Sequence, residues 1–244
     1  MLNTNLQSRS LDRRDRAHGL SLVELMIGLA VGLILVAGAL TLFASNVVGT
    51  RNLVRETRVN QDLRAAADLI NRDLRRAGYW ANAVNGTILP LGGASAPANP
   101  YTGISGTFGA TSSQVNYNFT RDTNDTLNAN EQFGFRLSGG AIQMKTDSTT
   151  WQSVTDPDIV TVTKFQVTDT QTNVAVGDMC TIGCNTTPPT PASAPTSACP
   201  NPPTVIMHRF DVLIEGNAAT DSRIKRTLRE SVRVRNNQFS GSCP

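Results

Sequence analysis

The stretch Arg16–Leu40, RAHGLSLVELMIGLAVGLILVAGAL, decides the architecture of this 244-residue chain. No charged residue occurs between Leu25 and Thr50, and the segment Leu25–Ala44 is almost entirely apolar. At about 1.5 Å per residue, a helix over this segment spans roughly 30 Å, the thickness of the hydrocarbon core of a bilayer. The sequence therefore predicts a membrane-spanning helix whose preceding arginines stay in the cytoplasm.

The order of signals before this helix is unusual. In a secretory signal peptide the apolar region precedes the cleavage site and is removed. Here the Gly19–Leu20 bond precedes the apolar segment, so cleavage there would retain the helix. The run Gly19-Leu-Ser-Leu-Val-Glu24 resembles the type IV prepilin motif, in which a prepilin peptidase cuts after glycine and methylates the new amine. The resemblance implies a leader peptide over 1–19 and N-methylation of Leu20, where the family usually has phenylalanine.

A lone carboxylate, Glu24, stands at the start of the apolar segment. An ionised carboxylate in a bilayer costs about 2 to 3 kcal/mol, so a partner or a function is expected. Cleavage after Gly19 would create a cationic amine on Leu20. We expect Glu24 to pair with this amine, in its own chain or in a neighbouring subunit, and so to set the register in which helices stack. The alternative is a helix-start residue, favoured by the macrodipole and by a Ser21-x-x-Glu24 capping box.

Two glycines inside the apolar segment, Gly28 and Gly32, form a small-x-x-x-small pair. Such pairs let another helix approach closely, although glycine is common in membrane helices for other reasons. We interpret the pair as weak support for helix packing.

The helix is predicted to continue beyond the bilayer, because the first proline of the chain is Pro90. Residues 20–50 form its membrane and assembly half, and residues 51–78 an amphipathic half that ends at Ala77–Gly78. On the charged side of this second half, Asp68 and Arg72 are four residues apart and are expected to pair. The apolar residues recur at spacings of three and four on one face: Val59, Leu63, Ala66, Ala67, Ile70, Leu74 and Ala77.

The remainder, 79–244, is predicted to be a periplasmic β-rich domain. Apolar and polar residues alternate in several short segments, and Ser138-Gly139-Gly140 between two of them indicates a hairpin. The expected strands lie at 115–119, 133–137, 142–144, 159–162 with 165–167 as one or two strands, 206–214 and 228–234. A long N-terminal helix packed on an antiparallel β-sheet is an α+β arrangement, and the resemblance of the leader to the prepilin motif implies a type IV pilin-like fold.

Four cysteines lie in the last third of the chain: Cys180, Cys184, Cys199 and Cys243. An even number in an exported domain favours disulfides, and three pairings remain open. A proline-rich loop, 184–203, is flanked by these cysteines, and a disulfide would limit its entropy.

The sequence contains few residues that could form a catalytic site. Of two histidines, His18 would leave with the leader, and His208 fits a structural position in a strand. A nucleophile elbow, a P-loop and an HExxH motif are all missing from the sequence. We expect a protein that is not an enzyme and needs no cofactor.

A polar run holding Asp122, Asn124 and Asn128 supplies hard oxygen ligands of the type that calcium prefers. Leu127 replaces the glycine of an EF-hand loop, and Asn and Asp also form turns between strands. The turn interpretation is favoured, and no metal is expected.

The C-terminal region is basic, with Arg229, Arg233 and Arg235 on one face of the last predicted strand. A solvated sheet face explains this pattern, and a subunit contact is an alternative. No aromatic residue is interleaved to stack on bases, so no nucleic-acid partner is expected.

The segments Asp73–Tyr79 and Arg226–Asn236 resemble the PilW family of minor pilins. The resemblance implies a low-abundance subunit that is stored in the inner membrane, joins other minor pilins in an initiation complex and primes polymerisation of the major pilin. Its partners would be those pilins, the prepilin peptidase, the inner-membrane assembly platform and a tip adhesin, and its final place would be the pilus fibre or tip. Alternatives are a J-type pseudopilin of a type II secretion system, and a membrane-anchored periplasmic enzyme or binding protein.

Overall fold

The computed structural model describes residues 21–87, 98–177 and 202–241. The chain divides into two compact units, Met1–Asn52 and Leu53–Pro244. Helix α1 (Leu22–Leu74) runs through the end of the first unit into the second. The expected leader over 1–19 lies outside the described residues.

The part of α1 that belongs to the first unit is apolar and exposed. Its most apolar window has a mean hydropathy of 2.5, none of the window is buried, and the helix is long and apolar enough to cross a membrane. Leu22, Ile34 and Leu35 leave 74%, 71% and 68% of their surface exposed. Apolar surface of this extent is unfavourable in water, so the segment needs lipid or other helices around it.

In the second unit, α1 buries one face. The predicted apolar stripe is buried, together with Asp73, which the sequence did not predict: Val59, Leu63, Ala66, Ala67, Ile70 and Leu74 in the helix, and Ala77 just beyond it. The helix ends at Leu74 and a turn follows through Gly78, which has a φ of 73°. This left-handed conformation favours glycine. The expected pairing of Arg72 with Asp68 is wrong, because Arg72 Nε instead lies 3.6 Å from Asp73 Oδ1.

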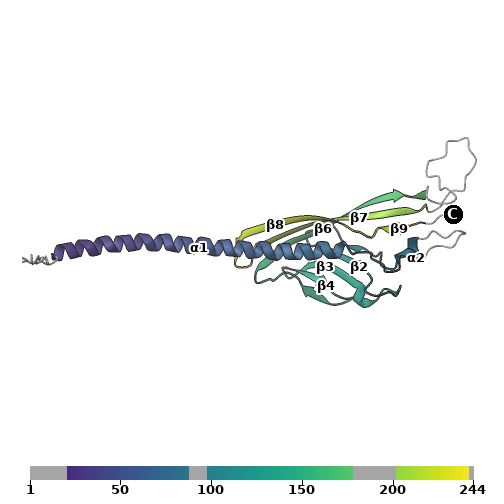
Figure 1. Cartoon of the computed structure of the whole chain (residues 1–244), viewed down its shortest axis with the longest axis horizontal. Coiled ribbons are helices and arrows are strands. Elements are labelled where there is room, and N and C mark those ends of the chain that lie inside the picture. Colours follow the sequence, from purple (N-terminus) through teal and green to yellow (C-terminus); the bar gives the residue numbers. More distant parts are fainter. Residues whose placement is uncertain (1–20, 88–97, 178–201, 242–244) are drawn as a thin grey trace, which may run out of the picture. The chain divides into compact units, whose positions relative to one another are not determined.

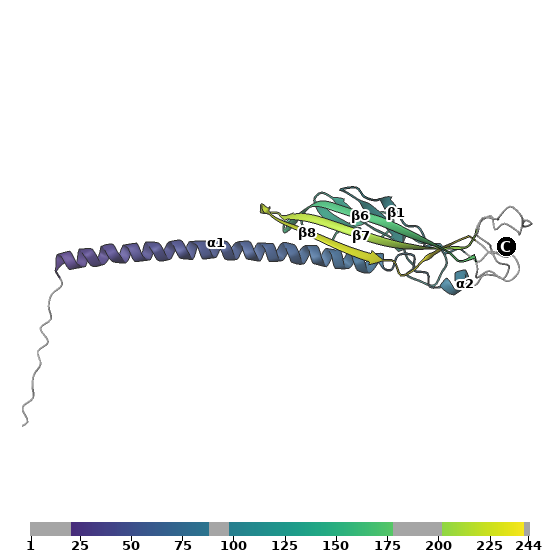
Figure 2. The same ribbon diagram turned by 90° about the horizontal axis from the view of Figure 1, so that it is seen from above.

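Two antiparallel sheets, where one was predicted, complete the second unit (Figures 1 and 2). The first has the order β1-β2-β3-β4-β5, and the second has the order β6-β7-β8 with β9 also paired to β7. The strands are β1 (Ser105–Thr107), β2 (Gln114–Asn118), β3 (Gln132–Ser138), β4 (Ala141–Lys145), β5 (Trp151–Ser153), β6 (Val160–Ala175), β7 (Thr204–Ala218), β8 (Asp221–Arg233) and β9 (Gln238–Ser240). A short helix α2 (Ala83–Thr87) and a 3-10 turn η1 (Ala129–Glu131) lie between them in the sequence.

The predicted hairpin at Ser138 is present. Gly139 and Gly140 connect β3 to β4 with φ values of 59° and 76°, which two consecutive glycines adopt without steric strain. Backbone bonds also join the two sheets: Ser113 N–H donates to Phe165 O at 2.8 Å, and Val162 N–H donates to Gly140 O at 2.7 Å.

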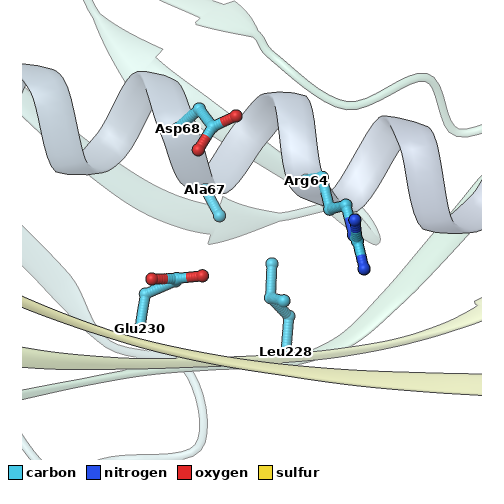
Figure 3. Close-up of a pocket in the computed structure, with 5 residues that line it drawn as sticks. All are labelled: Arg64, Ala67, Asp68, Leu228 and Glu230. Carbon is cyan, nitrogen blue, oxygen red and sulfur yellow. The ribbon is translucent and has the colours of Figure 1, made fainter.

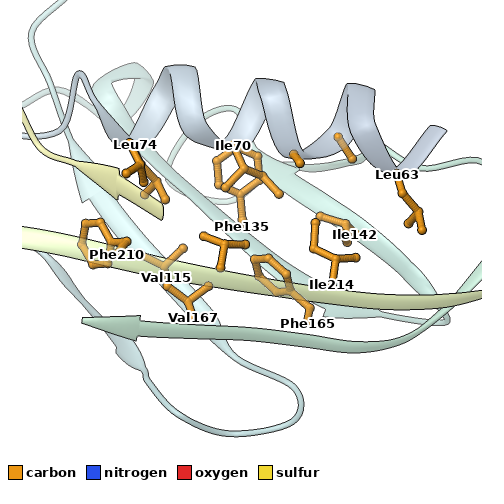
Figure 4. Packing of buried hydrophobic residues seen from close by; sticks show 14 of the residues in the cluster. Leu63, Ile70, Leu74, Val115, Phe135, Ile142, Phe165, Val167, Phe210 and Ile214 are labelled. Carbon is orange, nitrogen blue, oxygen red and sulfur yellow. The ribbon is translucent and has the colours of Figure 1, made fainter. Parts of the chain in front are cut away.

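The core lies between the buried face of α1 and the inner faces of the sheets (Figure 4). Ile70 and Leu74 of α1 are fully buried there, as are Phe135, Phe165 and Phe210 of the strands. The alternation that predicted the strands therefore marks their inward faces. The α+β, pilin-like fold is confirmed, with a long N-terminal helix packed on antiparallel sheets.

Candidate functional site

Glu24 lies in the first turn of α1 and is exposed. The N–H of Leu25 donates to the carbonyl of Ser21 at 3.1 Å, which starts the helical ladder beside the carboxylate. A carboxylate in the first turn is favoured by the helix dipole. Gly19 and Leu20, the predicted cleavage and methylation site, lie outside the described residues, so a Glu24 to Leu20 ion pair stays a prediction.

Gly28 and Gly32 face open space. A Cβ built on either glycine would have no heavy atom within 4 Å, and the same is true of Gly38. The fold of the described chain therefore gives no packing reason for glycine at these positions. A second helix that approaches closely from outside the subunit would be a reason for glycine at these positions.

The two segments that carry the minor-pilin resemblance, Asp73–Tyr79 and Arg226–Asn236, meet in space. Arg235 N–H donates to the carbonyl of Arg75 at 3.1 Å, just beyond the end of α1. The side-chain amide of Asn236 donates to Arg76 O at 3.3 Å and to Ala77 O at 3.0 Å. Carbonyls at a helix C-terminus lack partners within the helix, so the second segment satisfies those of the first. Sequence reasoning missed this contact, since the partners are about 160 residues apart.

An open cleft of about 380 Å³, here called the arginine cleft, lies where the two segments meet. It is lined by Arg75, Arg233, Val234 and Arg235. Val234 is buried, whereas the three arginines are exposed. The sequence grouped Arg233 and Arg235 on one face, but it did not predict that Arg75 of the helix end would join them.

A second cavity, of about 360 Å³, lies between α1 and β8 (Figure 3). Arg64, Ala67 and Asp68 line it from the helix, and Leu228 and Glu230 line it from the strand. Its charged side chains have both signs and form no ion pair with one another in the described part of the chain. The cavity has no catalytic arrangement of a nucleophile with a base.

The calcium candidate residues form a hydrogen-bonded turn. Asp122 Oδ1 accepts from Asn124 N–H at 3.0 Å, and Asp122 Oδ2 accepts from the Asn124 amide at 2.7 Å and from the Asn128 amide at 3.5 Å. Both carboxylate oxygens therefore already have donors. Within residues 21–87, 98–177 and 202–241, no group of three or more His, Cys, Asp and Glu side chains could hold a metal ion.

The last acid of this polar run, Glu131, is fully buried and accepts hydrogen bonds within the turn. Its carboxylate accepts from Arg121 N–H at 2.7 Å and from Asn128 N–H at 2.8 Å. Desolvation raises the pKa of Glu131, but the backbone N–H groups of Asn128 and Arg121, with smaller contributions from Thr120 and Tyr101, outweigh it and lower the pKa. The spacing Asn128-x-x-Glu131 is a capping-box signal that could have predicted this role.

His208 is buried in β7, where it leaves 4% of its surface exposed. Its Nδ1 lies 2.9 Å from Asp169 Oδ2 on β6, and its ring stacks on Phe210 with centroids 6.2 Å apart. The Nε2 atom is buried and has no partner among the described residues. Because the ring is enclosed, this pair has the features of a core histidine rather than of a proton-transfer site open to substrate.

The four cysteines, Cys180, Cys184, Cys199 and Cys243, lie outside the described residues, as does most of the loop 184–203. Their pairing stays a prediction.

Comparison with known protein families gives two matches. The model of the prokaryotic N-terminal methylation motif matches residues 14–40, and the model of prepilin peptidase-dependent protein B matches residues 52–234, three quarters of the chain. No match was found among curated proteins or among solved structures. The methylation motif includes Glu24, Gly28 and Gly32, and the second model covers the amphipathic half of α1 and strands β1 to β8. The chain is therefore a type IV pilin-like minor pilin that belongs to the family of prepilin peptidase-dependent protein B.

Proposed function

We propose that this subunit joins other minor pilins in an initiation complex at the inner membrane and primes polymerisation of the major pilin. The observation that carries the proposal is the exposed apolar part of α1, with Glu24 in its first turn. The globular unit would face the periplasm before assembly and lie at the fibre or its tip afterwards.

The physical step is a transfer of the apolar helix from lipid to a bundle of neighbouring helices. Exposing this helix to water would lose most of its hydrophobic stabilisation, so it has to pass directly from one apolar environment to the other. Glu24 would gain a cationic amine as its partner during this transfer, which fixes the register between subunits. The work of extraction would come from a separate assembly motor, and the subunit itself would have a structural role with no catalysis.

The test replaces the chromosomal gene with a Glu24→Ala variant. We expect the leader to be cleaved normally, as measured by mass spectrometry, while the variant is lost from sheared fibres and twitching motility falls. Ser21→Ala is the matched control, because it removes a polar group from the same turn without removing the charge. Normal incorporation of a cleaved Glu24→Ala subunit would falsify the assembly role.

Deletion of the gene distinguishes a pilus subunit from a secretion pseudopilin. Loss of surface pili with intact secretion of exoproteins is the expected result. The reverse outcome would assign the chain to a type II secretion pseudopilus, and loss of neither would favour a membrane-anchored protein of another class.

A further inference from the structure

The arginine cleft holds three positive charges that the fold does not neutralise. In the described residues, none of Arg75, Arg233 and Arg235 forms an ion pair. Among the described residues, the side chain of Arg233 donates one hydrogen bond, from Nη2 to Met207 Sδ at 2.9 Å, and a thioether is a weak acceptor. Three guanidinium groups on neighbouring backbone positions repel one another unless an anion lies between them.

The arginines beside the cleft behave differently. Arg72 contacts Asp73, the guanidinium of Arg76 lies 4.1 Å from the ring centre of Phe119, and Arg209 donates to Ser231 Oγ at 2.8 Å. Each of these has a partner inside the subunit. The cleft arginines therefore differ from these three neighbours in having no carboxylate or aromatic partner among the described residues.

The backbone holds the cleft in place. Arg235 N–H bonds to Arg75 O at 3.1 Å, and Val234 N–H bonds to His208 O at 3.0 Å. Val234 leaves 1% of its surface exposed and anchors the strand end in the core. Because these backbone positions are fixed before any ligand arrives, binding does not have to order them.

We propose that the arginine cleft binds carboxylate groups on the surface of a partner subunit. Planar guanidinium groups bind carboxylates through two parallel hydrogen bonds, and three of them at one open cleft suit one or two acidic side chains. A single-stranded nucleic acid is less suitable, because none of the described residues that line the cleft is aromatic and could stack on a base. The proposal rests on the proposed role in assembly, for which it supplies a contact outside the helix.

The test uses the full-length chain in detergent micelles and a fluorescein-labelled glutamate-rich peptide, with binding followed by fluorescence anisotropy at low salt. The test variant is Arg75→Gln with Arg235→Gln. The control is Lys225→Gln with Arg229→Gln, which removes the same charge from exposed positions of β8 outside the cleft. The backbone bond between residues 75 and 235 needs neither side chain, so both variants should unfold at the temperature of the unmodified protein.

We expect the test variant to bind the peptide about tenfold more weakly, and the control to bind it almost normally. An equal loss in both variants would show diffuse attraction to a basic surface and would overturn the proposal. Duplex DNA that binds through the cleft and displaces the peptide would also overturn it, as would preferential binding to phosphatidylglycerol micelles. If the Glu24→Ala subunit assembles normally while the peptide result holds, the assembly role fails and the carboxylate site stands.

Discussion

The side-chain amide of Asn236 lies 3.0 Å from the carbonyl oxygen of Ala77 and donates a hydrogen bond to it. The same amide reaches Arg76 O at 3.3 Å, so one residue that follows β8 caps the end of α1. An asparagine amide has two donor hydrogens, which suits two neighbouring carbonyls.

Replacement of Asn236 by alanine should lower the free energy of unfolding by about 1 kcal/mol, because Ala77 O loses its donor at a partly buried site while Arg76 O keeps the N–H of Tyr79 at 3.0 Å. Chemical denaturation of the full-length chain measures this change. Asn237→Ala is the matched control, since Asn237 is exposed and should change stability little. Equal effects of the two substitutions would contradict the capping role.

The buried carboxylate of Glu131 should make stability depend on pH in the acid range. Its pKa is lowered in the folded state from an ordinary value of 4.5, so its ionised form contributes stability that is fully present above about pH 4.5. This contribution is lost as the pH falls through the lower, folded-state pKa. We expect Glu131→Gln to remove part of the acid-induced loss, as measured by urea unfolding between neutral and acid pH.

A partly exposed acid, Asp147, provides the control for Glu131. The pKa of Asp147 is also lowered, to about 2, chiefly by the backbone N–H groups of Thr149 and Thr150, but the side chain stands in a surface turn. Asp147→Asn should lower stability at neutral pH less than Glu131→Gln, because water can replace its hydrogen bonds. A larger effect at Asp147 would be incompatible with the role assigned to Glu131.

The buried face of α1 should carry much of the stability of the second unit. Ile70 has no exposed surface, so Ile70→Ala should lower the free energy of unfolding by about 2 to 5 kcal/mol through lost burial and a residual cavity. Leu53→Ala on the same helix removes an apolar side chain that is 64% exposed, and it should have little effect. Thermal unfolding monitored by near-ultraviolet circular dichroism distinguishes the two.

The open surroundings of Gly32 lead to a prediction about assembly. A Cβ at position 32 would have no heavy atom within 4 Å outside the nearby backbone of its own helix, so Gly32→Leu should leave the helix content unchanged or slightly higher. If neighbouring helices approach at Gly28 and Gly32, the leucine should reduce the recovery of the subunit in sheared fibres. Gly38→Leu, also in open space, is the control, and an equal reduction there would mean that bulk anywhere on the helix is harmful.

Much of the fold could be predicted, because the spacing of apolar residues along the sequence shows which face of a helix or strand is buried. The helical stripe and the alternation of Ile206, His208, Phe210, Val212 and Ile214 both mark surfaces that the structure packs inward. The division of β6 into two predicted segments also has a physical cause. A register shift between Val162 and Lys164 changes which positions face inward, so one strand of 16 residues reads as two.

The other features of the fold could not be predicted, because a sequence pattern shows which face of a strand is buried but not which other segment the strand contacts. Three short strands, β1, β5 and β9, carry too few alternating apolar residues to be recognised. Alternation also identifies an inward face without saying which strand lies beside it, so two sheets were predicted as one. The contact of Asn236 with Ala77, and the convergence of Arg75 with Arg235, depend on hydrogen bonds across 160 residues that no local spacing encodes.

The cap at Asn236 has a consequence for timing. A ribosome that adds about 5 to 20 residues per second takes about 10 to 30 s to proceed from residue 76 to residue 236. During that interval the end of α1 lacks its amide donor. The apolar face of α1 around Leu63 and Ile70 also stays uncovered until β7 and β8 have been synthesised. A newly made subunit therefore passes through a period in which its apolar helix has been synthesised but the core of its globular unit is still incomplete and accessible to proteases.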